Sequence, residues 1–129
     1  MLFNQDWEQS NNPVSRLLSR AADLMEQFGL AKFVRKDSNG SMCYLGALEE
    51  ANGGMFSADV YNPLVVEASK RIQKALDLTP AGYRGYHGPE TVYPVVAVVD
   101  WNNAPERTKE EVVEAMRQAA KVKETADAI

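Results

Sequence analysis

The sequence contains very little of the two residue types that most often bind metals or attack substrates. Cys43 is the only cysteine and His87 the only histidine among 129 residues. A single cysteine cannot form a disulfide within the chain, which agrees with a reducing compartment. The chain shows no ligand spacing typical of zinc sites, and no glycine-rich phosphate loop between a strand and a helix. We therefore expect neither a metal nor a cofactor.

Long apolar runs and clusters of basic residues are also missing. The longest β-branched apolar run is Val95–Val99, far short of the roughly 20 residues that cross a bilayer. Residues 1–6 lack the basic start and apolar core of a signal peptide. The net charge is −4, and lysines and arginines are spread along the chain, so no basic patch for nucleic acid is present. We expect a cytoplasmic protein that binds neither membranes nor nucleic acid.

The residues that are present predict a mainly α fold, a compact single domain of about four helices over residues 1–129. Hydrophobic residues make up 45% of the chain and charged residues 25%, as in ordinary globular domains. Residues 1–11 are predicted to form an N-terminal arm and residues 122–129 a loose C-terminal tail. Residues 79–94, rich in glycine, proline and aromatics, predict a long loop.

Two helices are predicted by the same start signal, an asparagine cap followed by a proline. Asn12-Pro13 begins a helix that Gly29 ends, and Asn62-Pro63 begins a later one. Apolar residues follow at helical spacing in both segments, so each helix has a face for the core. The polar residues between them, which we expect to face water, include Ser15, Ser19 and Arg71.

The middle of the chain carries a turn signal and then a short helix signal. Residues 37–40, Asp-Ser-Asn-Gly, are typical of a turn. Residues 31–35 and 41–44 on either side would then pair as a short β-hairpin, or else form an ordered loop. Apolar residues within 45–51 share one helical face, which places Cys43 at or just before the start of a helix.

The last third of the chain has the clearest helix signal. Thr108 and Glu111 have the spacing of a capping box, in which each side chain bonds the other residue's amide. Trp101 is a large apolar residue that we expect to fix the turn at residues 102–105 to the core, with a recognition role as the alternative. Residues 95–99 suit either a buried strand or a short helix, and so short a run does not distinguish them.

Cys43 is the strongest candidate for chemistry in the chain. A thiol at a helix N-terminus gains thiolate character from the helix dipole. His87 would serve as its base, and Asp100 or Asn102 would orient the imidazole, in the residue order known for papain-like hydrolases. The other interpretation is a small buried hydrophobic residue, which the apolar neighbours of Cys43 favour.

The aromatic loop is the strongest candidate for binding another protein. It places Tyr83, Arg84, Tyr86 and His87 close together, and tyrosine and arginine dominate the residues that carry interface energy. Trp101 is added as a fifth candidate contact. The other interpretation is that the tyrosines fold back and cover the helices.

Three segments together resemble a family of small uncharacterised domains from actinobacteria and their phages. They are the helix at residues 13–29, Gly-Ser-Met-Cys-Tyr-Leu-Gly-Ala-Leu at residues 40–48, and Trp-Asn-Asn at residues 101–103 with the Arg-Thr and Glu-Val pairs at residues 107–112. The recurring patterns of that family are Cys-x-x-Gly-Ala and Trp-Asn-Asp, so Asn103 stands where the family has an acidic residue. The resemblance implies a mainly helical fold, favours a helix at residues 95–99, and carries no assigned activity.

These observations lead to one main hypothesis and two alternatives. The main hypothesis is a non-enzymatic protein-binding domain, a phage product that engages a bacterial host protein in the host cytoplasm through the aromatic loop. Its acidic surface would favour a basic partner. The first alternative is a Cys-dependent hydrolase or transferase that uses Cys43 and His87. The second is a homodimeric structural protein joined through its N-terminal apolar side chains, Leu2, Phe3 and Trp7.

Overall fold

The computed structural model describes residues 12–53, 62–78 and 90–121, and its regular structure is helical. The helices are α2 (Pro13–Phe28), α3 (Tyr44–Ala51), α4 (Pro63–Ala75), α5 (Tyr93–Asn102) and α6 (Lys109–Lys121), with a short 3-10 helix, η1 (Glu90–Val92), before α5. The mainly α prediction is therefore confirmed. Within these described ranges there are five α-helices where the sequence predicts about four, because residues 95–99 belong to a helix and not to a strand.

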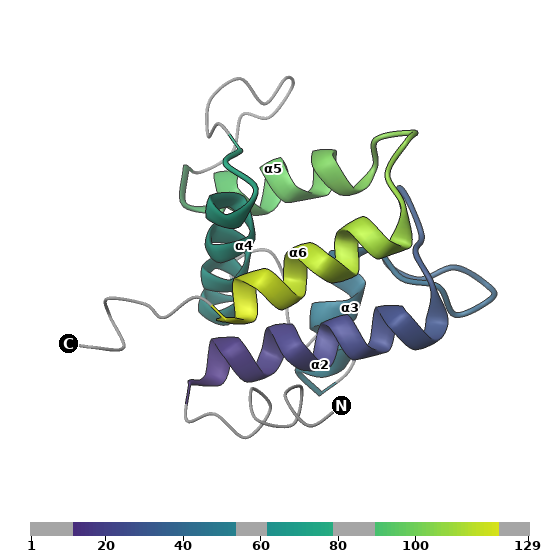
Figure 1. Ribbon diagram of the computed structural model, residues 1–129, viewed down its shortest axis with the longest axis horizontal. Helices are drawn as coiled ribbons and strands as arrows, with labels where there is room; N and C mark the ends of the chain where they lie inside the picture. The colour runs from purple at the N-terminus through teal and green to yellow at the C-terminus, as the bar shows by residue number, and fades with distance from the viewer. Residues whose placement is uncertain (1–11, 54–61, 79–89, 122–129) are drawn as a thin grey trace.

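The helices pack as two contacting groups (Figure 1). Helices α2 and α6 lie side by side and run in opposite directions, and α3 packs on α2. Helix α4 crosses α6 near the C-terminal end of α6 and also packs on α5. Helix α6 therefore contacts both groups, which explains why its buried side is wide. That side comprises Val112, Val113, Ala115, Met116, Ala119 and Ala120.

The predicted starts of α2 and α4 are confirmed. The Asn12 Oδ1 atom accepts hydrogen bonds from the amides of Val14 and Ser15, each at 3.0 Å. The Asn62 Oδ1 atom accepts one from the Leu64 amide at 2.8 Å. Both prolines occupy the first turn, where a missing amide costs nothing. These bonds satisfy amides that have no partner inside their own helix.

The expectation that Ser15, Ser19 and Arg71 face water is wrong. All three are buried, and Arg71 is only 3% exposed. The guanidinium of Arg71 donates to the Ser15 hydroxyl at 2.9 Å and to the Asn12 Oδ1 atom at 3.0 Å. Helix α4 packs against α2, so Arg71 meets Ser15 and Asn12 as hydrogen-bond partners inside the domain.

The predicted hairpin between residues 31–35 and 41–44 is also wrong. Leu30 and Lys36 each form an isolated bridge with the same residue, Met42. The backbone from Leu30 to Lys36 therefore begins and ends beside Met42 and forms a loop. Residues 31–35 and 41–44 do not pair as two β-strands. Asp37 stabilises the return, because its Oδ1 atom accepts from the amides of Asn39 at 2.9 Å and Ser41 at 3.0 Å.

Helix α5 begins within the segment that the sequence predicts as a loop. Tyr93 and Pro94, the last residues of the predicted 79–94 loop, form its first turn. Proline is accepted there because the first helical amides have no partner in the helix. Residues 90–92 of that loop form η1, and residues 79–89 lie outside the described residues, as do the predicted arm at 1–11 and tail at 122–129.

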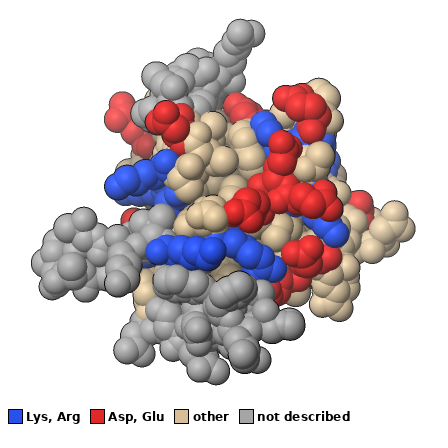
Figure 2. Space-filling model, in the orientation of Figure 1, with Lys and Arg blue, Asp and Glu red and all other residues tan. Residues whose placement is uncertain are grey.

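The exposed side of α6 is acidic at its start. Glu110 and Glu111 lie in the first turn and Glu114 follows, all exposed. Figure 2 shows acidic side chains gathered over the N-terminal half of this helix. Carboxylates are favourable there because the helix dipole is positive at its N-terminus.

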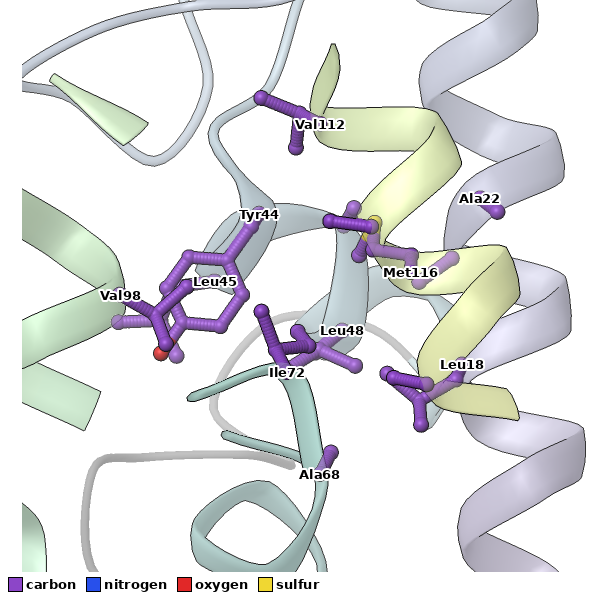
Figure 3. Packing of buried hydrophobic residues seen from close by; sticks show 14 of the residues in the cluster. Leu18, Ala22, Tyr44, Leu45, Leu48, Ala68, Ile72, Val98, Val112 and Met116 are labelled. Carbon is purple, nitrogen blue, oxygen red and sulfur yellow. The ribbon is translucent and has the colours of Figure 1, made fainter. Parts of the chain in front are cut away.

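The core lies where α2, α3, α4 and α6 meet (Figure 3). Leu48 of α3 lies beside Ile72 of α4, and both are almost fully buried. The Tyr44 ring is fully buried, and its hydroxyl lies 2.8 Å from the Ser69 hydroxyl and donates to the Val95 carbonyl at 3.3 Å. Burial raises the pKa of Tyr44 well above its usual range, so the phenol stays protonated and serves as a structural link.

Candidate functional site

The two sequence motifs meet at one buried asparagine. Asn102 at the end of α5 is 0% exposed. Its Oδ1 atom accepts from the Tyr44 amide at 3.0 Å, and its Nδ2 atom donates to the Ala31 carbonyl at 3.1 Å and to the Asn103 Oδ1 atom at 3.2 Å. One side chain therefore joins α5, the start of α3 and the 30–36 loop.

Gly46 of the cysteine motif packs against the backbone of the same loop. A Cβ atom at this position would overlap the Arg35 carbonyl oxygen and lie 2.8 Å from its carbon. The Arg35 carbonyl in turn accepts from the Cys43 amide at 3.2 Å, and its guanidinium pairs with Glu49 at 2.7 Å. The glycine of the motif is therefore required for close packing.

Cys43 is the N-cap of α3, as the sequence predicts. Its Sγ atom accepts from the Gly46 amide at 3.4 Å, and the residue is 8% exposed. Burial raises the pKa of this thiol, an effect larger than the opposing effect of the Gly46 amide. A raised pKa keeps the thiol protonated at neutral pH, which is unfavourable for a nucleophile.

Native Cys43 is expected to alkylate with iodoacetamide about tenfold or more slower at pH 7 than in the urea-unfolded chain. The folded-state pKa is raised above the ordinary 9.0, so folding favours the neutral thiol. The buried neutral thiol therefore contributes its full stability to the fold at pH values below the unfolded-state pKa of Cys43. This contribution is lost as the pH rises through the higher folded-state pKa. Quenched time points read by mass spectrometry measure both rates. Equal rates, or a faster native rate, would contradict a buried structural thiol.

Of the other residues proposed for a cysteine hydrolase, Asn102 lines the same pocket as Cys43, but it uses both ends of its amide in the bonds already given. Asp100 is exposed on α5. His87 lies outside the described residues, so its role as the base for Cys43 stays a prediction from the sequence. Within the described ranges no group of histidine, cysteine and acidic side chains is arranged to hold a metal ion.

The loop between Leu30 and Lys36 presents two apolar side chains to solvent. Phe33 is 79% exposed and Val34 48%. Phe33 has a φ of +68°, a conformation that costs a residue with a side chain roughly 1–3 kcal/mol. Its amide is held by the Asn103 Oδ1 atom at 2.9 Å. Phe33 therefore combines a strained backbone with an exposed aromatic side chain.

A pocket of about 250 Å³ lies directly beside this exposed pair. Its lining also includes Leu45 and Val99, together with Arg35, Cys43, Asn102 and Asn103. Phe33 and Val34 line the same pocket, so the exposed apolar side chains and the pocket lie on one face of the domain. We call this surface, with Phe33, Val34, Leu45 and Val99, the Phe33 face.

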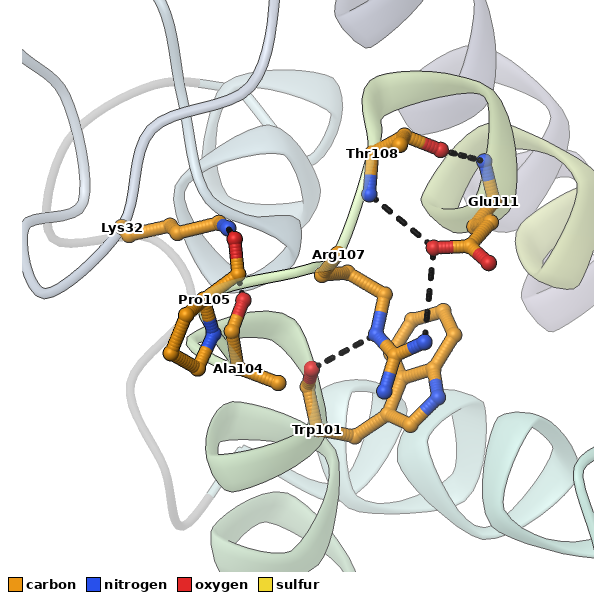
Figure 4. Close-up of polar contacts among 7 residues, drawn as sticks. All are labelled: Lys32, Trp101, Ala104, Pro105, Arg107, Thr108 and Glu111. Carbon is orange, nitrogen blue, oxygen red and sulfur yellow. Dashed lines mark hydrogen bonds and ion pairs between the residues drawn. The ribbon is translucent and has the colours of Figure 1, made fainter.

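Trp101 of α5 is held by Arg107, which lies between α5 and α6 (Figure 4). The Arg107 guanidinium carbon lies 4.2 Å from the centre of the Trp101 ring, and its Nε atom donates to the Trp101 carbonyl at 2.9 Å. Lys32 fixes the turn itself, because its Nζ atom donates to the carbonyls of Ala104 at 2.6 Å and Pro105 at 2.9 Å. Trp101 also packs on the core, so its anchoring role is confirmed.

The capping box that begins α6 is confirmed. The Glu111 amide donates to the Thr108 hydroxyl at 3.2 Å, and the Thr108 amide donates to the Glu111 carboxylate at 3.0 Å. The amide of Thr108, helped by Arg107, holds the pKa of Glu111 below its usual range. The carboxylate therefore stays ionised down to lower pH than a free glutamate.

A larger groove of about 430 Å³ opens beside Trp101. Its lining divides into apolar side chains, which we term the floor, and exposed glutamates with a glutamine, which we term the rim. We call this surface the Trp101 groove. Its lining comprises Ala75, Leu76, Trp101, Arg107, Glu110, Glu111, Glu114, Ala115 and Gln118.

Of the residues that the sequence proposes for partner binding, Trp101 lies in the part of the chain that the structure describes, and it lines the groove. The other four, Tyr83, Arg84, Tyr86 and His87, lie outside the described residues. The proposed dimer contacts Leu2, Phe3 and Trp7 lie outside them as well. The sequence reasoning missed Phe33, because a prediction of paired strands gave no reason to expect its side chain in water.

The structure is a small helical domain in which Asn102 and Gly46, one from each sequence motif, hold the 30–36 loop, α3 and α5 together. The chain belongs to a family of unknown function, DUF6197, whose model matches residues 9–122. This match confirms the resemblance to a domain family without an assigned activity. No curated protein and no solved structure matches the chain. In the part of the chain that the structure describes, no helix has the length and apolar character to cross a membrane.

Proposed function

We propose that this protein is a non-enzymatic protein-binding domain that contacts its partner through the Phe33 face. The observation that carries the proposal is the exposed, strained Phe33 beside an apolar pocket. Aromatic side chains, phenylalanine included, are enriched at the buried cores of protein interfaces. Asn103 supports the role, because its hydrogen bond to the Phe33 amide prepares the loop before a partner arrives and so lowers the cost of binding.

The partner proposed is a bacterial host protein, and the domain is proposed to be a phage product acting in the cytoplasm of an actinobacterium. The family resemblance supports this context. The aromatic residues Tyr83, Arg84, Tyr86 and His87 remain the candidate contacts drawn from the sequence. The cysteine hydrolase is the less favoured alternative, because burial raises the pKa of Cys43 and Asn102 already uses its amide in structural bonds.

Affinity capture from an actinobacterial lysate, with mass spectrometry of the retained proteins, tests this function. The Phe33→Ala variant is expected to retain about tenfold less of a specific partner than the wild type. Phe28→Ala is the matched control, since Phe28 is 44% exposed but lies outside the Phe33 face, and it is expected to retain the partner. A triple alanine variant at Tyr83, Tyr86 and His87 measures the part played by the aromatic loop.

The folding of every variant is checked by circular dichroism and thermal melting before capture. Retention of the same partner by the wild type and by Phe33→Ala would reject the Phe33 face. Loss of the partner from Phe28→Ala as well would also reject it, because the effect would not be specific to Phe33.

A further inference from the structure

The Trp101 groove is a second surface with the properties of a binding site, independent of the Phe33 face. Its apolar floor comes from three helices: Ala75 and Leu76 at the end of α4, Trp101 on α5, and Ala115 on α6. A volume of about 430 Å³ lies within the range of about 300–1,000 Å³ found for sites that enclose a ligand. The floor therefore suits a large apolar side chain.

The rim of this groove carries more negative than positive charge. Three glutamates line it, and Arg107 is the one cation among the lining residues. Arg107 is already engaged, since it stacks on Trp101 and pairs with Glu111 at 3.4 Å. Glu111 in turn is used in the capping box with Thr108.

Glu110 and Glu114 therefore supply the charge that a ligand would meet. They are four residues apart on α6, so they point to the same side of the helix. The Glu114 carboxylate accepts from the neutral Gln118 amide at 2.6 Å, which leaves its charge intact. A cationic group beside the groove would be attracted to both carboxylates.

We propose that the Trp101 groove binds a peptide segment of a partner protein in which a large apolar side chain adjoins lysine or arginine. The apolar side chain packs on Trp101 and Ala115, and the basic side chains pair with Glu110 and Glu114. The charge complementarity selects this occupant over an acidic peptide or a nucleic acid, both of which the rim repels. This proposal goes beyond the proposed function, because it concerns a separate surface and a defined ligand chemistry.

A fluorescence titration of the full chain tests the proposal directly. Trp101 lies in the groove and reports on it once the other tryptophan is replaced by Trp7→Phe. The probe is the capped peptide Lys-Lys-Leu-Leu-Lys-Lys. Two comparison peptides, Glu-Glu-Leu-Leu-Glu-Glu and Lys-Lys-Ser-Ser-Lys-Lys, separate charge from apolar character. The lysine-leucine peptide is expected to change Trp101 emission saturably with a Kd below about 1 mM, at least tenfold tighter than either comparison.

Two matched variants distinguish the rim from general electrostatics. The double variant Glu110→Gln, Glu114→Gln is expected to weaken the lysine-leucine peptide about tenfold and to reduce its sensitivity to salt. The single variant Glu90→Gln changes an exposed glutamate outside the groove and is expected to bind as the parent does. Equal binding of all three peptides, unchanged affinity in the double variant, or no saturation at millimolar peptide would each overturn the proposal.

Discussion

Replacing Asn102 with leucine is expected to lower the free energy of unfolding by about 3 kcal/mol or more. Leucine has nearly the same size but leaves the Tyr44 amide and the Ala31 carbonyl without their partners. Each buried polar group left unpaired costs about 1–3 kcal/mol. The cost is large because Asn102 joins three segments, so losing it loosens α3, α5 and the 30–36 loop together.

Urea denaturation followed by circular dichroism measures this change. Asn103→Ala is the matched control, because it removes the bonds of the Asn103 Oδ1 atom to the Phe33 amide and to Asn102 but keeps the two bonds of Asn102 to Tyr44 and Ala31. It is expected to cost about 1 kcal/mol or less. A loss in Asn102→Leu no greater than in Asn103→Ala would show that Asn102 does not hold the junction.

Replacing Gly46 with alanine is expected to cost a similar amount, about 3 kcal/mol, for a steric reason. The new Cβ atom would overlap the Arg35 carbonyl, which is backbone and cannot rotate away. Moving Arg35 would break its carbonyl's bond to the Cys43 amide at 3.2 Å and disturb its pair with Glu49. In an ordinary helix interior the same change would stabilise the protein, because alanine is the better helix former. The sign of the effect therefore tests the packing.

Thermal melting with Gly53→Ala as the control separates packing from backbone conformation. Gly53 has a φ of +113° but meets no atom within 4 Å, so its replacement carries conformational strain alone, about 1 kcal/mol. Gly46→Ala is expected to lower Tm by roughly 10 °C or more and Gly53→Ala by only a few degrees. A Gly46→Ala protein as stable as the wild type would contradict the close approach of Arg35.

These two results would give the sequence motifs a structural meaning. The glycine of Cys-x-x-Gly-Ala permits the 30–36 loop to approach α3, and the first asparagine of Trp-Asn-Asn bonds that loop and α3 to α5. Cys43 acts as the cap of α3 between them. The motifs therefore explain how the Phe33 face is held in place, and they require no chemistry at the cysteine.

The candidate surfaces could be predicted only in part. Trp101 is identifiable in the sequence as a large apolar side chain next to a turn, and it lines the groove. The acidic start of α6 is equally readable, since Glu110 and Glu111 follow the cap. The groove itself needs Ala75 and Leu76, which arrive from α4 through packing alone. Phe33 could not be identified, because its exposure follows from both ends of its loop returning to Met42.

The sequence by itself determined where α2, α4 and α6 begin, because a capping side chain bonds an amide two or three residues away. Asn12, Asn62 and the Thr108–Glu111 box act within one helical turn, so no other part of the chain is needed. Only the tertiary structure decided which polar side chains are buried. Arg71 and Asn102 bond groups 56 and 58 residues distant, and only packing makes those partners neighbours. A polar residue is predicted to face water until another element supplies its hydrogen bonds.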